Sequence, residues 1–329
     1  MSSVSRRRFI ALAGSGLGAA ALAGCSLTRA AEPSAAPVAA RVTETPPPTP
    51  SPTPTPRPIA PRGRVPVALM KGTPYEVEGI EINSGLAGPR IMVLGGVHGN
   101  EPGGWLAAEG IADWQVSRGS LLVLPRVNWR AAAVIERTLP EIGDINRAYP
   151  GNATGMPAQQ IANAIVETGR AFEPELLFDL HESWVFYNER GANGGTAFIG
   201  QTMSLGGGAT EATVDRMADV VRAVNAQITA REEFYMRGAS TPRPGVKVIT
   251  STPRPTPSPG VFPTSTPSAT RAPGNGVTFG GTSSLSVGQW IKGCVPILIE
   301  MGQQDQAESR RAHLHQMLVR TTLEQSGML

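Results

Sequence analysis

The sequence predicts an α/β fold: a doubly wound, mostly parallel sheet with helices on both faces. Two observations lead to this fold class. Short apolar runs alternate along the chain with longer segments of helical periodicity, and the runs are continuously apolar, which is typical of strands covered on both sides. Alternation of this kind indicates parallel strands joined by crossover helices.

The elements follow in chain order. Five apolar runs are predicted strands: RIMVLGGV (90–97), SLLVLPRV (120–127), ELLFDLH (175–181), TAFIG (196–200) and VPILIEMG (295–302). Four amphipathic segments are predicted helices: 103–115, 158–172, 211–230 and 308–325. Because each helix follows a strand, it can return the chain to the same edge of the sheet.

Proline divides the chain into domains. Of its 30 prolines, twelve lie between Pro33 and Pro66 and nine between Pro242 and Pro273, so the rest of the chain holds few. Such segments have little to bury and favour extended conformations. We therefore predict a disordered tether at 25–65 and a single domain at 66–329, interrupted by a disordered insert at about 240–275.

The N-terminus is typical of an export signal. Arg6 to Arg8 precede an apolar segment too short and too rich in glycine for a membrane span, and this start resembles a twin-arginine signal. Leu22-Ala23-Gly24-Cys25 resembles a lipoprotein cleavage box. We expect removal of residues 1–24 and a lipid on Cys25 that anchors the protein to the outer face of a bacterial membrane. The alternative is a cytoplasmic protein with a chance apolar start.

Charge and cysteine content limit the possible partners and the possible disulfides. The net charge of +3 owes much to the N-terminal arginines, and no part of the predicted domain forms a basic stripe, which argues against nucleic acid as a partner. If Cys25 carries a lipid, Cys294 has no cysteine to pair with. We interpret Cys294 as a small buried hydrophobe.

Polar residues gather at the ends of four predicted strands. His98 and Glu101 follow the first, Asn128 the second and His181 the third, while Glu300 ends the last. Parallel sheets bind ligands at the carboxyl ends of their strands. We therefore expect these side chains to line a site at one edge of the sheet.

The histidines indicate a metal. Of four in the chain, His98 and His181 end strands, whereas the others fall on the C-terminal helix. With Glu101 they supply the three protein ligands that a catalytic zinc typically takes. The glycines of GGVHGNEPGG would let the backbone approach the ion. Taken singly, His98 is better explained as a hydrogen-bonded turn histidine and His181 as a core histidine, and it is their joint placement that favours a metal.

Five motifs in order resemble the succinylglutamate desuccinylase/aspartoacylase family, within the zinc carboxypeptidase-like hydrolases: GGVHGNEPGG, LPRVN, GDINRAYPG, DLHES and ILIEMG. The resemblance spans about residues 90 to 302. It implies one Zn²⁺ held by His98, Glu101 and His181, with Glu300 as general base. It also implies that Asn146 and Arg147 bind a substrate carboxylate and that Arg137, with Arg126 as a rival, polarises the scissile carbonyl.

The function implied is metal-assisted hydrolysis of an amide bond in an N-acyl amino acid or a peptide carrying a free carboxylate. Only 29 residues follow Glu300, so we expect no separate C-terminal β domain of the kind aspartoacylases add, and an open site suits cell-wall peptides equally well. A non-catalytic ligand- or metal-binding lipoprotein on the same fold is the alternative of another class. A serine hydrolase is disfavoured because no G-x-S-x-G occurs.

Overall fold

The computed structural model describes residues 59–189, 195–238, 243–249 and 282–329. The chain divides into two units, Met1–Thr55 and Pro56–Leu329, and the described residues all belong to the second. The predicted signal peptide, the lipidation site at Cys25, most of the tether and residues 250–275 of the predicted insert lie outside them. Within the described part, no helix has the length and hydropathy needed to cross a membrane.

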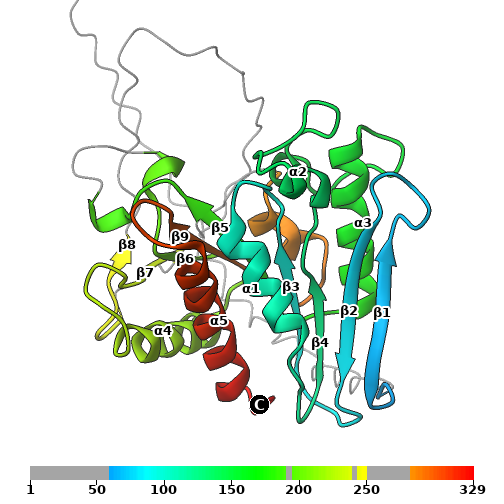
Figure 1. Ribbon diagram of the computed structural model, residues 1–329. Helices are drawn as coiled ribbons and strands as arrows, with labels where there is room; N and C mark the ends of the chain where they lie inside the picture. The colour runs from blue at the N-terminus through cyan, green and yellow to red at the C-terminus, as the bar shows by residue number, and fades with distance from the viewer. Residues whose placement is uncertain (1–58, 190–194, 239–242, 250–281) are drawn as a thin grey trace, which may run out of the picture. The chain divides into compact units, whose positions relative to one another are not determined.

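One mixed sheet organises the second unit. Its strand order is β1-β2-β4-β3-β5-β9-β6-β7-β8 (Figure 1). The strands β4, β3, β5 and β9 are parallel to one another, and so are β6, β7 and β8. Three neighbouring pairs are antiparallel: β1 with β2, β2 with β4, and β9 with β6. The strands are β1 (Gly63–Leu69), β2 (Val77–Asn83), β3 (Arg90–Gly95), β4 (Ser120–Leu124), β5 (Leu176–Ser183), β6 (Thr202–Leu205), β7 (Tyr235–Arg237), β8 (Val248–Ile249) and β9 (Val295–Gly302).

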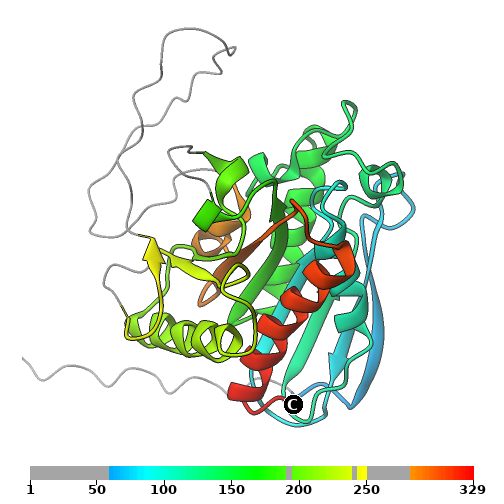
Figure 2. The same ribbon diagram turned by 60° about the vertical axis from the view of Figure 1, so that its left-hand side comes forward.

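Helices cover both faces of the sheet, which confirms the predicted fold class. On one face α1 (Pro102–Ala112), α4 (Glu211–Asn225) and α5 (Glu308–Gln325) pack on a core that includes Val93 and Phe178. On the other, α3 (Pro157–Phe172) packs on Met92 and Leu94 (Figures 1 and 2). The alternation of Met92, Val93 and Leu94 between the two cores is the period-two pattern of a strand buried on both sides.

Several elements differ from the sequence predictions. The N-terminal hairpin β1–β2 was not predicted, and β1 begins at Gly63, inside the segment assigned to the tether. Residues 196–200 are not a strand: Thr196–Phe198 is a 3₁₀ turn, and the strand is Thr202–Leu205. Val248–Ile249, within the range assigned to the insert, pairs with β7 as β8.

The sheet is not covered equally on the α3 face. Beside β3 and β4 this face is apolar, but at the carboxyl half of β5 and on β9, β6 and β7 it carries polar and charged side chains. The register places His181 of β5 beside Glu300 of β9, and Glu300 beside Thr202 of β6. This region of the sheet forms the floor of the site described next.

Candidate metal centre and substrate cavity

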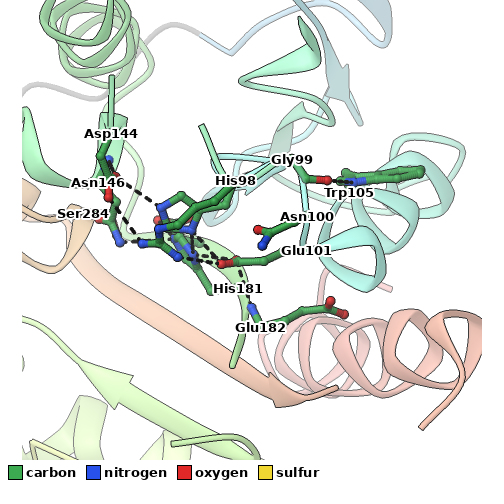
Figure 3. Close-up of polar contacts among 12 residues, drawn as sticks. His98, Gly99, Asn100, Glu101, Trp105, Asp144, Asn146, His181, Glu182 and Ser284 are labelled. Carbon is green, nitrogen blue, oxygen red and sulfur yellow. Dashed lines mark hydrogen bonds and ion pairs between the residues drawn. The ribbon is translucent and has the colours of Figure 1, made fainter. Parts of the chain in front are cut away.

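Three buried side chains converge at the carboxyl edge of β3 and β5. His98 lies in the turn after β3, Glu101 occupies the N-cap of α1, and His181 is in β5. His98 Nδ1 lies 2.7 Å from Glu101 Oε1, His181 Nδ1 lies 2.9 Å from Glu101 Oε2, and the two Nδ1 atoms lie 3.0 Å apart (Figure 3). The structure thus brings together the three residues predicted as ligands.

The outer nitrogen of each histidine faces a second carboxylate. His98 Nε2 is 3.2 Å from Asp144 Oδ1, and His181 Nε2 is 2.7 Å from Asp179 Oδ2. These contacts hold a proton on each Nε2, which leaves both Nδ1 lone pairs aimed at one point beside a carboxylate oxygen. Two lone pairs facing each other repel unless a cation lies between them, so the donor set fits a zinc ion.

The electrostatics also favour a cation. Burial alone would lower the pKa of His181, but Asp179 and Glu101 raise it well above its ordinary value. Burial alone would raise the pKa of Glu101, yet the two histidines hold it below its usual range. Glu101 makes no capping hydrogen bond to α1, and its Oε2 accepts from the backbone N–H of Glu182 instead, at 3.0 Å.

The glycines near the centre allow close packing of the backbone. A Cβ on Gly104 would lie 2.3 Å from the carbonyl oxygen of Leu180, and one on Gly103 would lie 2.1 Å from Glu182 Oε1. Gly99 likewise lies against the backbone of Ala131. Gly103 and Gly104 let α1 pack closely on α5 and β5, and Gly99 lets the turn before α1 pack on α2 (Trp129–Ala133). This packing positions Glu101.

A cavity of about 700 Å³ opens beside the three ligands. Glu300 lines it, on the strand next to His181 and on the same face. Burial raises the pKa of Glu300 to about 8, opposed by the positive charge of His181. A carboxyl group whose pKa lies near neutrality is suited to accept and return a proton.

Two arginines were rivals for the carbonyl-polarising role. Arg137 lines the cavity, and its guanidinium lies 3.3 Å from both Glu101 Oε1 and Asp144 Oδ2. Arg126 instead pairs with Glu109 and stacks 3.8 Å from the centre of the Trp105 ring, outside the lining of this cavity. The geometry therefore favours Arg137.

Asn146 and Arg147 both line the cavity, from the 3₁₀ turn η1 (Ile145–Arg147). Arg147 is exposed, and its Nη1 donates to the carbonyl of Asn146 at 2.8 Å. Asn146 is buried, and its Oδ1 accepts from the backbone N–H of Ser284 at 2.8 Å. Asp144 caps the turn through the N–H of Asn146. Asn146 thus joins two cavity walls, whereas Arg147 presents a charge to solvent at the mouth.

One strand-end residue does not belong to the site. Asn128 caps α2, accepting from the N–H of Ala131, and it lies outside the cavity lining, so the expectation that it joins the other strand-end residues was wrong. Of the aromatic residues after His181, Trp184 lines the cavity with 66% of its surface exposed, while Phe186 is fully buried.

The sequence interpretation missed a charged network behind the ligands. Glu182 is buried, and its two oxygens accept from Arg311 Nε at 2.6 Å and Gln303 Nε2 at 3.0 Å. Gln303 also donates to the carbonyl of Asn100 in the ligand turn. The network ties α5 to both segments that carry ligands. Arg311 is one of several polar residues of an amphipathic helix, and the sequence alone does not indicate that its partner is Glu182.

The fold and the site together define an α/β protein with a buried His-Glu-His cluster at the carboxyl edge of a mostly parallel sheet. The model of the succinylglutamate desuccinylase/aspartoacylase catalytic domain matches residues 87–184 of the chain. This confirms the resemblance inferred from the motifs. The matched segment includes His98, Glu101 and His181 and ends before Glu300.

Solved structures share the fold at low sequence identity. A succinylglutamate desuccinylase/aspartoacylase from Rhodobacter sphaeroides is 16% identical to this chain, with a TM-score of 0.54. The match covers 82% of this chain and 67% of the Rhodobacter sphaeroides chain. The ectoine utilization protein EutE (DoeB) from Ruegeria pomeroyi is 18% identical, with a TM-score of 0.51 and coverages of 83% and 70%.

The cell shape determinant protein Csd4 from Helicobacter pylori, solved with a tripeptide bound, is 17% identical with a TM-score of 0.52. The match covers 77% of this chain and 56% of Csd4, so this chain spans little more than half of that protein. No curated protein sequence matches significantly.

Proposed function

We propose that the protein is a zinc-dependent hydrolase that cleaves an amide bond next to a free carboxylate. The observation that carries the proposal is the pair of Nδ1 atoms 3.0 Å apart, both facing Glu101, beside a cavity lined by Glu300. Desuccinylases and aspartoacylases are hydrolases, and the family match supports the reaction class.

His98, Glu101 and His181 would hold the ion, which when bound acts as a Lewis acid that makes water more acidic. Glu300 then accepts a proton from the attacking water and returns it to the departing amine. Its place beside His181 puts the carboxylate next to the ligands without making it one of them.

Charged groups at the mouth would hold the substrate. Arg137 neutralises negative charge that develops on the carbonyl oxygen, and Arg147 pairs with a substrate carboxylate through its planar fork. Asn146 holds the wall from which Arg147 projects and offers its own amide group to the substrate. Fixing the carboxylate places the scissile bond over the ligand cluster.

The test separates these roles. We expect Glu300→Gln to retain zinc and to lower kcat by about 10² to 10⁴, and Arg147→Ala chiefly to weaken substrates that carry a carboxylate. Glu324→Gln, on the exposed face of α5, is the matched control. Full activity of Glu300→Gln on any substrate that the wild type cleaves would exclude Glu300 as the general base, and Glu182 would then be the next candidate to test.

A second candidate is a carboxypeptidase or amidase acting on cell-wall peptides. It is favoured by the shared fold with Csd4, a cell shape determinant with a tripeptide-bound structure. Hydrolysis of acyl amino acids, cell-wall peptides and esters, with and without chelator, distinguishes the two. Stoichiometric zinc with no hydrolysis of any of them would instead support a non-catalytic metal-binding lipoprotein.

We further propose export in the folded state and a lipid anchor on Cys25, on the basis of the N-terminal sequence. Replacing Arg6 and Arg7 by lysine should block export, and Cys25→Ala should release the protein from the membrane fraction. Normal export of the double lysine variant would contradict the twin-arginine route. Such an anchor would place the enzyme in the cell envelope.

A further inference from the structure

The helix α2 carries apolar side chains on its outer face as well as on its inner one. Its inner residues Ala131 and Ala132 are buried. On the outside Trp129 is 46% exposed, and Val134 and Ile135, which directly follow the helix, are 57% and 55% exposed. Single exposed apolar residues are ordinary, but these lie close together in the chain, and the outer face of a surface helix is usually polar. We call Trp129, Val134 and Ile135 the α2 patch.

Ile135 keeps its apolar side chain in a strained backbone conformation. Its φ is 56°, in the left-handed region that β-branched residues rarely adopt and that asparagine or glycine adopts at little cost. The side chain is more than half exposed, so burial within the chain offsets little of that strain. Strained residues concentrate at functional surfaces, so the conformation and the exposure together point to a contact with another surface.

The arginines beside the α2 patch already have partners. Arg130 Nη2 lies 3.3 Å from Glu141 Oε1. Arg137 pairs with Glu101 through Nη1 and with Asp144 through Nη2, each at 3.3 Å. Since these cations are paired, apolar contact rather than charge has to drive the docking of a partner. A tryptophan beside two β-branched side chains matches the interface of a lipid bilayer, where indole rings lie at the level of the headgroups.

The proposed lipid anchor keeps a membrane within reach of the domain. The chain between Cys25 and Ile59 holds 33 residues. At full extension it spans at most roughly 110 Å, whereas a domain of the size described is roughly 45 Å across. The anchor therefore allows either end of the domain to reach the membrane, and the chemistry of the surface decides which end docks.

We propose that the α2 patch docks the anchored domain on the lipid bilayer of the envelope membrane. This inference rests on the proposed anchor at Cys25 and adds an orientation, which the anchor alone does not give. Tethering raises the effective concentration of the membrane, so a patch too small to hold a free protein there suffices. Arg137, two residues after Ile135, lines the cavity, and its carbonyl accepts from the N–H of Gly99 at 3.2 Å. Docking thus holds the cavity mouth close to the membrane surface.

Trp129 itself reports the contact. The mature chain, residues 25–329, is coupled through Cys25 to vesicles of phosphatidylethanolamine and phosphatidylglycerol that contain a maleimide lipid, while Cys294, the other cysteine, is buried. Bromine atoms on the acyl chains quench tryptophan emission on contact. We expect the coupled chain to lose emission in brominated vesicles relative to unbrominated ones, and Trp129→Phe to remove most of that difference.

Two substitutions separate docking from folding. Ile135→Asn removes the apolar side chain and places at φ 56° a residue that tolerates this conformation, so stability in urea should equal or exceed that of the parent chain. The quenching should nevertheless fall, because removing a half-exposed isoleucine from the contact weakens docking about 5- to 10-fold. Val134→Ser should act in the same direction.

Leu86→Ser is the matched control. Leu86 is 62% exposed, and its carbonyl accepts from the N–H of Gly119 at the amino end of β4, whereas α2 follows the carboxyl end of that strand (Figure 1). This variant should be quenched as strongly as the parent chain. Absence of quenching in the coupled chain, or equal quenching in Ile135→Asn or Trp129→Phe, would overturn the docking surface.

The chemical linkage takes the place of the native lipid, so failure of the anchor and failure of the surface are distinguishable. If Cys25→Ala stays in the membrane fraction of cells, the anchor proposal fails, and quenching in the coupled vesicles still decides the docking surface. If Cys25→Ala is released but the coupled chain is not quenched, the anchor stands and the docking surface fails.

Discussion

Close packing of α1 on β5 predicts opposite effects for two glycine substitutions in the same helix. A Cβ at Gly104 would lie 2.3 Å from the backbone oxygen of Leu180, more than 1 Å inside the 3.4 Å at which ordinary contact begins. At Gly110 the nearest atom is also at 2.3 Å, but it is Nε2 of Gln316, the far end of a flexible side chain. Neither glycine has a positive φ, so the backbone conformation at both positions is one that alanine adopts.

The magnitudes follow from these neighbours. Alanine in place of helical glycine gains about 0.5 to 1 kcal/mol, whereas overpacking against atoms that cannot move costs about 1 to 3 kcal/mol. Gly104→Ala should therefore lower the free energy of unfolding by about 1 to 2 kcal/mol. Gly110→Ala should leave it unchanged or raise it by up to about 1 kcal/mol, since Gln316 gives up only a 3.3 Å hydrogen bond to Ala107.

The same displacement should reach the metal centre. Moving α1 away from β5 shifts Glu101, at its N-cap, away from His181. We expect Gly104→Ala to weaken zinc binding in a chelator competition assay and Gly110→Ala to leave it unchanged, with urea denaturation reporting stability. If Gly104→Ala matches the wild type in both stability and zinc affinity, α1 does not position the ligand through this contact.

Three further predictions concern other groups. Asp179→Asn should lower zinc affinity by about 10- to 100-fold in chelator competition, because the carboxylate orients the His181 ring; an unchanged affinity would exclude that role. Arg311→Met should cost about 3 to 5 kcal/mol of stability in urea denaturation, because it leaves Glu182 buried without its charge partner, and a loss below about 1 kcal/mol would contradict this. Burial raises the pKa of Cys294 to about 12, so its thiol stays protonated at pH 8 and should react with iodoacetamide only after unfolding; rapid alkylation of Cys294 in the native protein, located by peptide mass mapping, would refute it.

The parts of the fold predicted from sequence are those with strong local signals. The runs that became β3, β4, β5 and β9 are continuously apolar because both their faces are covered. The strands toward the two ends of the sheet escaped prediction for other reasons. Most of β1 is exposed and contains a proline, β2 mixes glutamate and glycine with its apolar residues, and β7 and β8 are only a few residues long. Their pairing is decided by neighbouring strands, which local periodicity does not report.

The same contrast holds for the site. His98, Glu101 and His181 were found because rare histidines ended strong strands and matched family motifs. Ser204 and Arg237, which also line the cavity, were missed because they lie on β6 and β7, where alternation with Met203, Leu205 and Met236 is too short to predict a strand. Arg126 and Arg137 were separated only by their partners in space, Glu109 for one and Glu101 for the other.

The metal centre draws on segments that are far apart in the chain. His98, Asp144 and His181 meet in space, and the Arg311 contact that supports Glu182 comes from α5. A chain without its tertiary structure therefore cannot present this donor set, and the zinc ion that we propose for it would bind to the native state alone. The concentration of free zinc would then set part of the apparent stability, and removing the ion with a chelator should lower the melting temperature of a protein that is otherwise unchanged.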